Sequence, residues 1–120
     1  MATILLVEDT PANLALATKL LTAAGHEVLT TETAAAGIAM ARDRLPDLVL
    51  MDLGLPDMDG WHALREIRAD ARGADLRVIA FTADAMLGDR ERALAGGFDG
   101  YMSKPIDFAT FAETVESYLQ

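Results

Sequence analysis

The chain has 120 residues, which suits one domain spanning residues 1–120 around a single hydrophobic core. Its net charge is −9, so its surface as a whole repels nucleic acid and anionic membranes, and we expect neither as a partner. It contains no cysteine, which excludes disulfide and thiolate chemistry. Its first residues lack the features of a signal peptide, and no apolar stretch approaches the ~20 residues needed to cross a bilayer. These features together predict a small cytoplasmic domain.

Strand-like and helix-like segments alternate along the chain. Apolar runs bounded by turn residues predict five strands, at 3–7, 27–31, 47–52, 77–82 and 100–102. A helix-like segment follows each of them. Five such units with short connections predict a mostly parallel sheet with helices on both faces, and continuous apolar runs suit strands buried on both sides.

Capping residues mark where the first two helices begin and end. Thr10 is suited to cap the first helix, and Gly25 is suited to end it. Thr33 is suited to cap an alanine-rich second helix, which ends near Arg44 because Pro46 cannot continue it.

Apolar spacing predicts the later helices. The third helix carries Trp61, Leu64 and Ile67 on one face. The fourth covers roughly 87–95 and ends at the glycine pair 96–97. The fifth shows apolar residues at intervals of three and four, at Phe108, Phe111, Val115 and Tyr118.

Charged or hydroxyl side chains stand at the carboxyl ends of four predicted strands. Glu8 and Asp9 follow the first, Asp52 ends the third, Thr82 ends the fourth, and Lys104 comes shortly after the fifth. In an open α/β sheet, ligands bind at that edge. A single acid at that edge often only caps the next helix or faces water. Acids that end two separate core strands, together with a lysine that follows a third strand, instead indicate that these residues form one site.

Carboxylates gathered at one edge require compensation. Two of them ~5 Å apart, at an effective dielectric of ~20, repel by about 3 kcal/mol. A cluster of three would strain the fold, shift a pKa or bind a cation. Oxygen ligands favour Mg²⁺ or Mn²⁺ over zinc.

Four pieces of the sequence, in this order, resemble the response-regulator receiver domain of two-component signalling. They are Val7-Glu8-Asp9, the block from Leu50 to Gly60 that contains Asp52, the pair Thr82-Ala83, and Tyr101-Met102-Ser103-Lys104-Pro105. The resemblance covers the whole chain. The stretches 85–89 and 95–100 are similar to those of stand-alone regulators of the cell-division type and of receiver modules in hybrid histidine kinases.

The resemblance implies an α/β, flavodoxin-like (βα)5 fold with a five-stranded parallel sheet in the order 2-1-3-4-5. That order places the third strand between the first and the fourth. The resemblance also implies a cis peptide bond between Lys104 and Pro105.

By the same resemblance, Asp52 accepts a phosphoryl group from the phosphohistidine of a histidine kinase or phosphotransfer protein. Asp9 and Asp52 ligate Mg²⁺, for which Mn²⁺ can substitute, together with the main-chain carbonyl of Gly54. Glu8 assists through water. Lys104 pairs with the phosphoryl oxygens.

The resemblance also implies a switch. Thr82 donates its hydroxyl to the phosphoryl group, and the ring of Tyr101 turns inward as Thr82 moves. The face built by the fourth helix, the fifth strand and the fifth helix then changes shape, and a downstream protein reads the change. The implied function is phosphorylation-dependent signalling rather than enzymatic turnover, because the domain catalyses only its own phosphotransfer and dephosphorylation.

Other functions fit the residues less well. An aspartyl-phosphate phosphatase similar to haloacid dehalogenases needs an Asp-x-Asp pair after the first strand, whereas Asp57 and Asp59 lie in a proline-containing loop. A mononucleotide-binding flavodoxin-like protein needs a phosphate loop where Glu8 and Asp9 would repel phosphate. The chain could also be a receiver excised from a larger kinase or regulator.

Two departures from the receiver pattern leave the lifetime of the phosphorylated state open. Gly54 has no side chain where many relatives carry one, and Asp84 lies two residues after Thr82. In the family, these positions flank the phosphoryl group and influence its hydrolysis.

Overall fold

The computed structural model describes residues 1–83 and 89–119. Within them, five parallel strands form one sheet in the order β2-β1-β3-β4-β5. The strands are β1 (Thr3–Val7), β2 (Glu27–Thr31), β3 (Leu48–Asp52), β4 (Val78–Thr82) and β5 (Gly100–Ser103). The predicted fold class and strand order are both confirmed.

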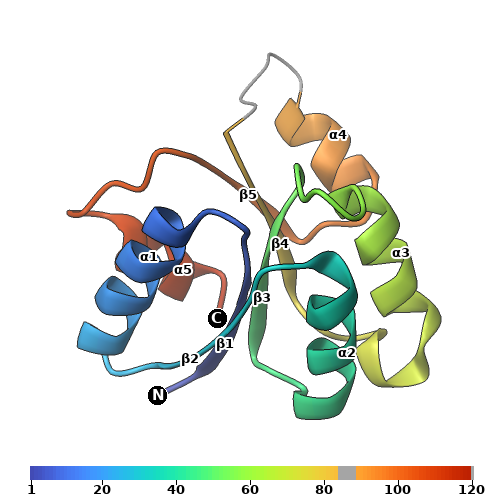
Figure 1. Ribbon diagram of the computed structural model, residues 1–120, viewed down its shortest axis with the longest axis horizontal. Coiled ribbons are helices and arrows are strands. Elements are labelled where there is room, and N and C mark those ends of the chain that lie inside the picture. Colours follow the sequence, from blue (N-terminus) through green and yellow to red (C-terminus); the bar gives the residue numbers. More distant parts are fainter. Residues whose placement is uncertain (84–88, 120) are drawn as a thin grey trace.

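Helices cover both faces of this sheet. They are α1 (Pro11–Ala23), α2 (Ala34–Arg44), α3 (Gly60–Ala69), α4 (Asp89–Ala95) and α5 (Phe111–Ser117), with a short 3-10 turn, η1 (Ala71–Gly73), after α3. Figure 1 shows α1 and α5 on one side of the sheet and α2, α3 and α4 on the other. The predicted start of the fourth helix at residue 87 lies outside the described residues.

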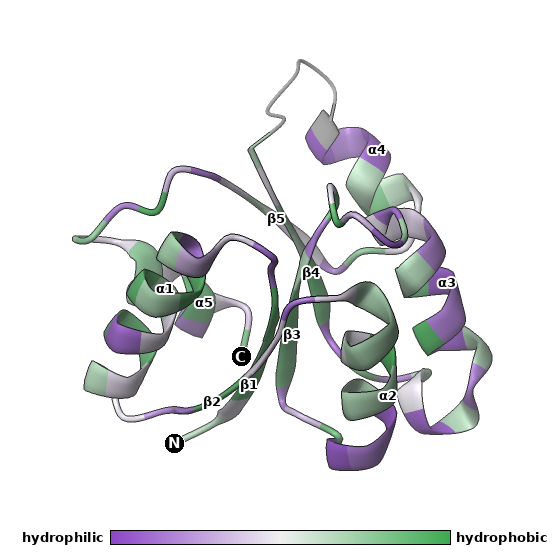
Figure 2. Cartoon of the chain, viewed as in Figure 1, coloured by the Kyte–Doolittle hydropathy of each residue, from purple (hydrophilic) through white to green (hydrophobic). Residues whose placement is uncertain are grey.

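The strands bury alternate side chains in two separate cores. One core joins Leu5, Val49 and Met51 to the inner faces of α2 and α3. The other joins Leu6 and Leu50, with the other alternate residues of these strands, to α1 and α5. Figure 2 shows β1 and β3 as largely hydrophobic, whereas the helices on either side of them also carry hydrophilic residues. Burial on both sides fixes the strands in register and therefore fixes where each one ends.

The register brings the ends of the central strands to one level. Val7, the last residue of β1, pairs with Met51 of β3. Asp52, the last residue of β3, pairs with Phe81 of β4. Glu8, which follows Val7, is therefore expected beside Asp52 at the carboxyl edge of the sheet.

The sequence prediction is confirmed at the beginning of α2 but not at the beginning of α1. Thr33 caps α2 as predicted, with Oγ1 accepting from the Ala36 N–H at 3.2 Å. Thr10 occupies the capping position of α1, but its side chain makes no capping hydrogen bond. The carboxylate of Glu8 instead accepts from the Thr10 N–H at 3.2 Å. The start of α1 is thus held by the neighbouring acid and by Pro11 in its first turn.

The prediction that Phe108 lies on the buried face of the fifth helix is wrong. Phe108 precedes α5, and 72% of its surface is exposed. Asp107 forms a turn there, because its carboxylate accepts from the Ala109 N–H at 2.9 Å and its carbonyl accepts from the Phe111 N–H at 2.9 Å. This side-chain bond competes with regular helical geometry until Phe111, which is buried as predicted.

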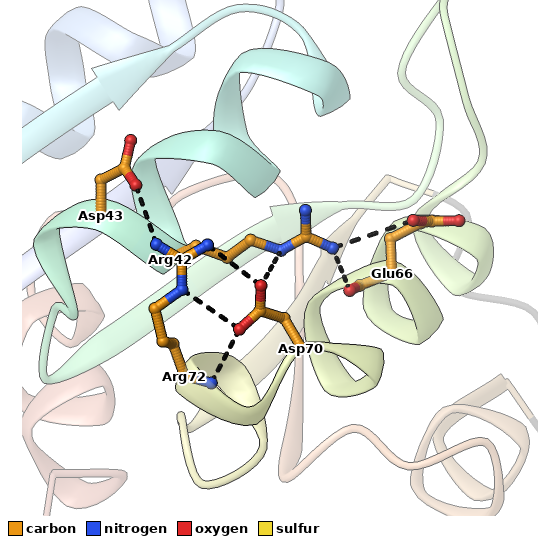
Figure 3. A network of polar contacts seen from close by, with 5 residues as sticks. All are labelled: Arg42, Asp43, Glu66, Asp70 and Arg72. Carbon is orange, nitrogen blue, oxygen red and sulfur yellow. Dashed lines mark hydrogen bonds and ion pairs between the residues drawn. The ribbon is translucent and has the colours of Figure 1, made fainter.

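A network of charged side chains joins α2, α3 and η1 (Figure 3). Arg72 donates to Asp70 at 3.0 Å and pairs with Asp43 of α2 at 3.3 Å. Arg42 of α2 approaches both Asp70, at 3.7 Å, and Glu66 of α3, at 3.8 Å. Hydrogen bonds from Arg72 lower the pKa of Asp70 to about 2. The network lies at the carboxyl ends of the two helices, away from the carboxyl edge of the sheet.

We expect Gly37→Ala to destabilise the fold, although alanine is the better helix former. A Cβ at Gly37 would lie 2.7 Å from a methyl carbon of Val7. Helix propensity favours alanine by about 1 kcal/mol, whereas forcing extra volume into a packed core typically costs about 1–3 kcal/mol. Urea unfolding should therefore show a net loss of stability. The exposed Ala39 of α2 supplies the control, because Ala39→Gly should lose only the propensity term. A more stable Gly37→Ala variant would contradict this packing.

Candidate functional site

Three carboxylates meet at the carboxyl edge of the sheet. One oxygen each from Glu8, Asp9 and Asp52 lies within 4.8 Å of the other two. Glu8 and Asp52 are buried, whereas Asp9 is exposed. The cluster therefore has a buried floor and one acid open to solvent.

Lys104 joins the two buried acids. Its Nζ lies 3.3 Å from Oδ2 of Asp52 and also forms an ion pair with Oε1 of Glu8. The ammonium group also lies 5.1 Å from the centre of the Phe81 ring. The peptide bond that follows, to Pro105, is cis, as the sequence resemblance implied.

Glu8 has partners for both of its oxygens. Oε2 accepts from the Thr10 N–H at 3.2 Å, and Oε1 accepts from the side-chain amide of Asn13 at 3.3 Å as well as from Lys104. Nothing in the sequence prediction pointed to Asn13. Its place in the first turn of the helix that follows the acidic pair is the signal that would have found it.

Burial raises the pKa of Glu8 above its ordinary value of 4.5, and the neighbouring Asp52 raises it further. The hydrogen bond and positive charge of Lys104 oppose that rise. Because the folded-state pKa exceeds the unfolded one, the stability that Glu8 contributes is complete below pH 4.5. It is lost as the pH rises through the folded-state value.

The charges and the donor atoms suit a divalent cation. The three carboxyl groups outnumber the single ammonium of Lys104, so negative charge is in excess at the site. All the donors are oxygen atoms, as Mg²⁺ requires. The exposed Asp9 leaves the cluster accessible from water.

Gly54 lies directly against the carboxylate of Asp52. Its N–H donates to Oδ1 of Asp52 at 2.9 Å. A Cβ on Gly54 would stand 3.8 Å from that oxygen, in ordinary van der Waals contact. Glycine at this position therefore contributes no side chain against the Asp52 carboxylate.

Thr82 and Tyr101 occupy different parts of this region. Thr82 is buried at the end of β4, one residue beyond the partner of Asp52, and its carbonyl accepts from the Lys104 N–H at 2.8 Å. Tyr101 is half-buried on β5, and its carbonyl accepts from the hydroxyl of Tyr118 at 3.2 Å. Tyr101 borders a cavity of about 430 Å³ formed by β5, the loop after it and α5. Asp84, the second departure noted above, lies outside the described residues.

The sequence over residues 4–116 matches the family model of the response regulator receiver domain. The chain belongs to the receiver-domain family. It is 40% identical over 116 residues to the polar-differentiation response regulator DivK of Brucella ovis, a match that covers 97% of this chain and 94% of the relative.

Solved structures of receiver domains superpose on the same fold. The receiver domain of a sensor histidine kinase from Pseudomonas aeruginosa PAO1 is 36% identical, with a TM-score of 0.87 over 98% of this chain and 97% of that one. That crystal structure has a magnesium ion coordinated in its active-site cleft. The chemotaxis response regulator CheY4 of Vibrio cholerae, at 23% identity and a TM-score of 0.90 over 98% of both chains, shares the fold.

The receiver domain is thus a signalling module of two-component systems. None of the helices described above has both the length and the apolar character required to traverse a bilayer.

We expect substitutions of the two partners of Glu8 to move its pKa in opposite directions. Asp52→Asn removes a neighbouring negative charge and should lower the pKa of Glu8, whereas Lys104→Met removes the positive charge and should raise it. NMR titration of the Glu8 side-chain carbon, without divalent cations, measures both shifts. Shifts of the same sign in the two variants would show that these three side chains do not form one electrostatic unit.

Proposed function

We propose that residues 1–120 form a single receiver unit that switches state when Asp52 is phosphorylated. The observation that carries the proposal is the cluster of Glu8, Asp9 and Asp52 with Lys104 in contact with two of its members. The match to nearly the full length of DivK, which is itself named a response regulator, supports the single unit. The donor is a phosphohistidine on a histidine kinase or phosphotransfer protein.

In the transfer step, a carboxylate oxygen of Asp52 attacks the phosphorus of the donor. The new O–P bond makes an acyl phosphate, and the P–N bond breaks with its electron pair passing to the imidazole nitrogen. The ammonium of Lys104, already 3.3 Å from Asp52, lies within reach of oxygens on a group attached there. It would compensate negative charge on the transferred group.

Asp9, Asp52 and the main-chain carbonyl of Gly54 would hold Mg²⁺, with Glu8 assisting through water. The oxygen donors, the excess of negative charge and the magnesium ion in the Pseudomonas receiver support this assignment. When bound, the ion would neutralise the phosphoryl oxygens and help to orient them. In its absence, Lys104 offsets part of the repulsion within the cluster, because it contacts both buried acids.

The structural change would pass from the phosphorylated Asp52 through β4 and β5. Thr82 lies at the edge that the phosphoryl group would reach, and its backbone is bonded to Lys104. A shift of Thr82 toward the phosphoryl group would make room for Tyr101 to turn inward from the cavity beside α5. A downstream protein would then recognise the altered surface of α4, β5 and α5.

We expect Asp52→Asn to abolish labelling by acetyl phosphate or by a phosphohistidine donor, because the amide is not a competent nucleophile. Chelation of divalent cations should stop labelling of the unsubstituted chain. Asp43→Asn on α2, far from the edge of the sheet, is the matched control and should label normally. Gel separation or mass spectrometry detects the product. Undiminished labelling of the Asp52 variant would show that another residue accepts the phosphoryl group.

We expect Thr82→Ala to separate phosphorylation from the response to it. The variant keeps all three carboxylates and Lys104, so Asp52 should still be labelled. Amide resonances of β5 and α5 should shift less on adding a phosphoryl mimic than they do in the unsubstituted chain. A full response of the Thr82 variant at Tyr101 would contradict the proposed route.

A further inference from the structure

The loop that joins β3 to α3, residues 53–59, is tied to the rest of the domain at three points. At its beginning, the Gly54 N–H donates to Asp52. At its end, the carboxylate of Asp59 accepts from the His62 N–H at 2.8 Å and caps α3. Between them, Asp57 accepts two hydrogen bonds from α2, a helix more than twenty residues away in the sequence. Of these three ties, the one through Asp57 spans the greatest distance along the chain.

Asp57 completes the start of α2. The first N–H groups of a helix have no partners within the helix. The Oδ1 of Asp57 accepts from the Ala34 N–H at 2.9 Å, and its Oδ2 accepts from the Ala35 N–H at 3.1 Å. Thr33 serves the third N–H, that of Ala36. The two bonds from α2 lower the pKa of Asp57 because they stabilise its charged form.

The loop is also packed closely on both sides of Asp57. Leu55 is buried in the same core as Ala34. On the other side, a Cβ on Gly60 would lie 2.8 Å from the Cα of Leu53, so the start of α3 touches the backbone of the loop. A short segment held this tightly passes a displacement at Asp57 on to Gly54, three residues earlier.

We propose that Asp57 is a positioning residue for the cation site. It fixes the loop against α2 so that Gly54 presents its N–H to Asp52 and its carbonyl to the cation. The proposal rests on the proposed function, because it takes the Gly54 carbonyl as a ligand. Asp57 itself is not a ligand in this scheme, since both of its oxygens accept hydrogen bonds from α2.

The test compares Mg²⁺ binding by the unsubstituted chain and three variants, using isothermal titration calorimetry. Asp57→Ala should raise the Kd for Mg²⁺ roughly tenfold, as the loss of other outer-shell partners does. Asp57→Asn keeps one acceptor for α2, so its Kd for Mg²⁺ should lie between those of the unsubstituted chain and Asp57→Ala. Thr33→Ala is the matched control: it removes a hydrogen bond from the same helix start but leaves the loop tied, so its Kd should stay close to that of the unsubstituted chain.

Two further readouts separate positioning from general damage. Amide hydrogen exchange at Ala34 and Ala35 should accelerate in Asp57→Ala while protection of the central strands is retained. The rate of labelling by acetyl phosphate should recover at saturating Mg²⁺, because positioning of the cation is weakened whereas Asp52 and Lys104 are unchanged. Should Asp57→Ala fail to fold, Asp57→Asn carries the same comparison.

Three results would overturn the proposal. Unchanged Mg²⁺ affinity in Asp57→Ala would show that the loop holds Gly54 without this tie. Equal weakening in Asp57→Asn and Asp57→Ala would assign the effect to charge alone. Equal weakening in Thr33→Ala would assign it to the stability of α2. A failure of the unsubstituted chain to bind Mg²⁺ is a distinct result, which would overturn the proposed function itself.

Discussion

Repulsion among carboxylates at one edge of a parallel sheet is the constraint on which the rest of this structure depends. Glu8 directly follows β1 and Asp52 ends β3, and two apolar cores fix the register of these neighbouring strands, so the two acids are held close together. Lys104 lies between them and compensates part of their charge. The remaining negative charge at this site destabilises the fold, and local destabilisation of this kind is common at functional sites.

The same lysine connects the charged edge with the surface proposed to change. The Lys104 N–H is bonded to the carbonyl of Thr82, and the loop after Pro105 leads into α5. The charge state of Asp52 therefore acts on a residue that belongs to both the site and the β5–α5 region. A change of charge at Asp52 can therefore alter the β5–α5 surface, because a movement of Lys104 toward a new phosphoryl oxygen would also move Thr82 and the loop that leads into α5.

Much of this arrangement could be predicted from the sequence, because it depends on patterns that parallel strands impose. Continuous apolar runs located the strands, and the polar residue after each run located the edge where Asp52, Glu8 and Lys104 meet. The order of the strands came only from the family resemblance, since hydrophobicity does not distinguish one buried strand from another. Thr33 illustrates a local signal that was sufficient, because its cap involves only the next three residues.

The features that the sequence did not predict depend on contacts between distant segments or on competing local bonds. In the sequence, Asp57 is an ordinary turn residue. Its two hydrogen bonds with α2 become visible only in the folded structure, where its loop lies against that helix. Asn13 reads as an ordinary residue of α1 until its amide is found against Glu8. Phe108 fits the helical spacing, but the turn at Asp107 excludes it from α5. Thr10 has the right type for a cap, but Glu8 binds its N–H instead.

Whether Asp9 and Asp52 share one hard cation beside Lys104 can be seen in a crystal structure of the unsubstituted chain grown with Mg²⁺. We expect a single ion about 2.1 Å from an oxygen of Asp9 and an oxygen of Asp52, with the Gly54 carbonyl in the coordination sphere. Magnesium bound elsewhere, or these two acids turned away from each other with no ion between them, would contradict it.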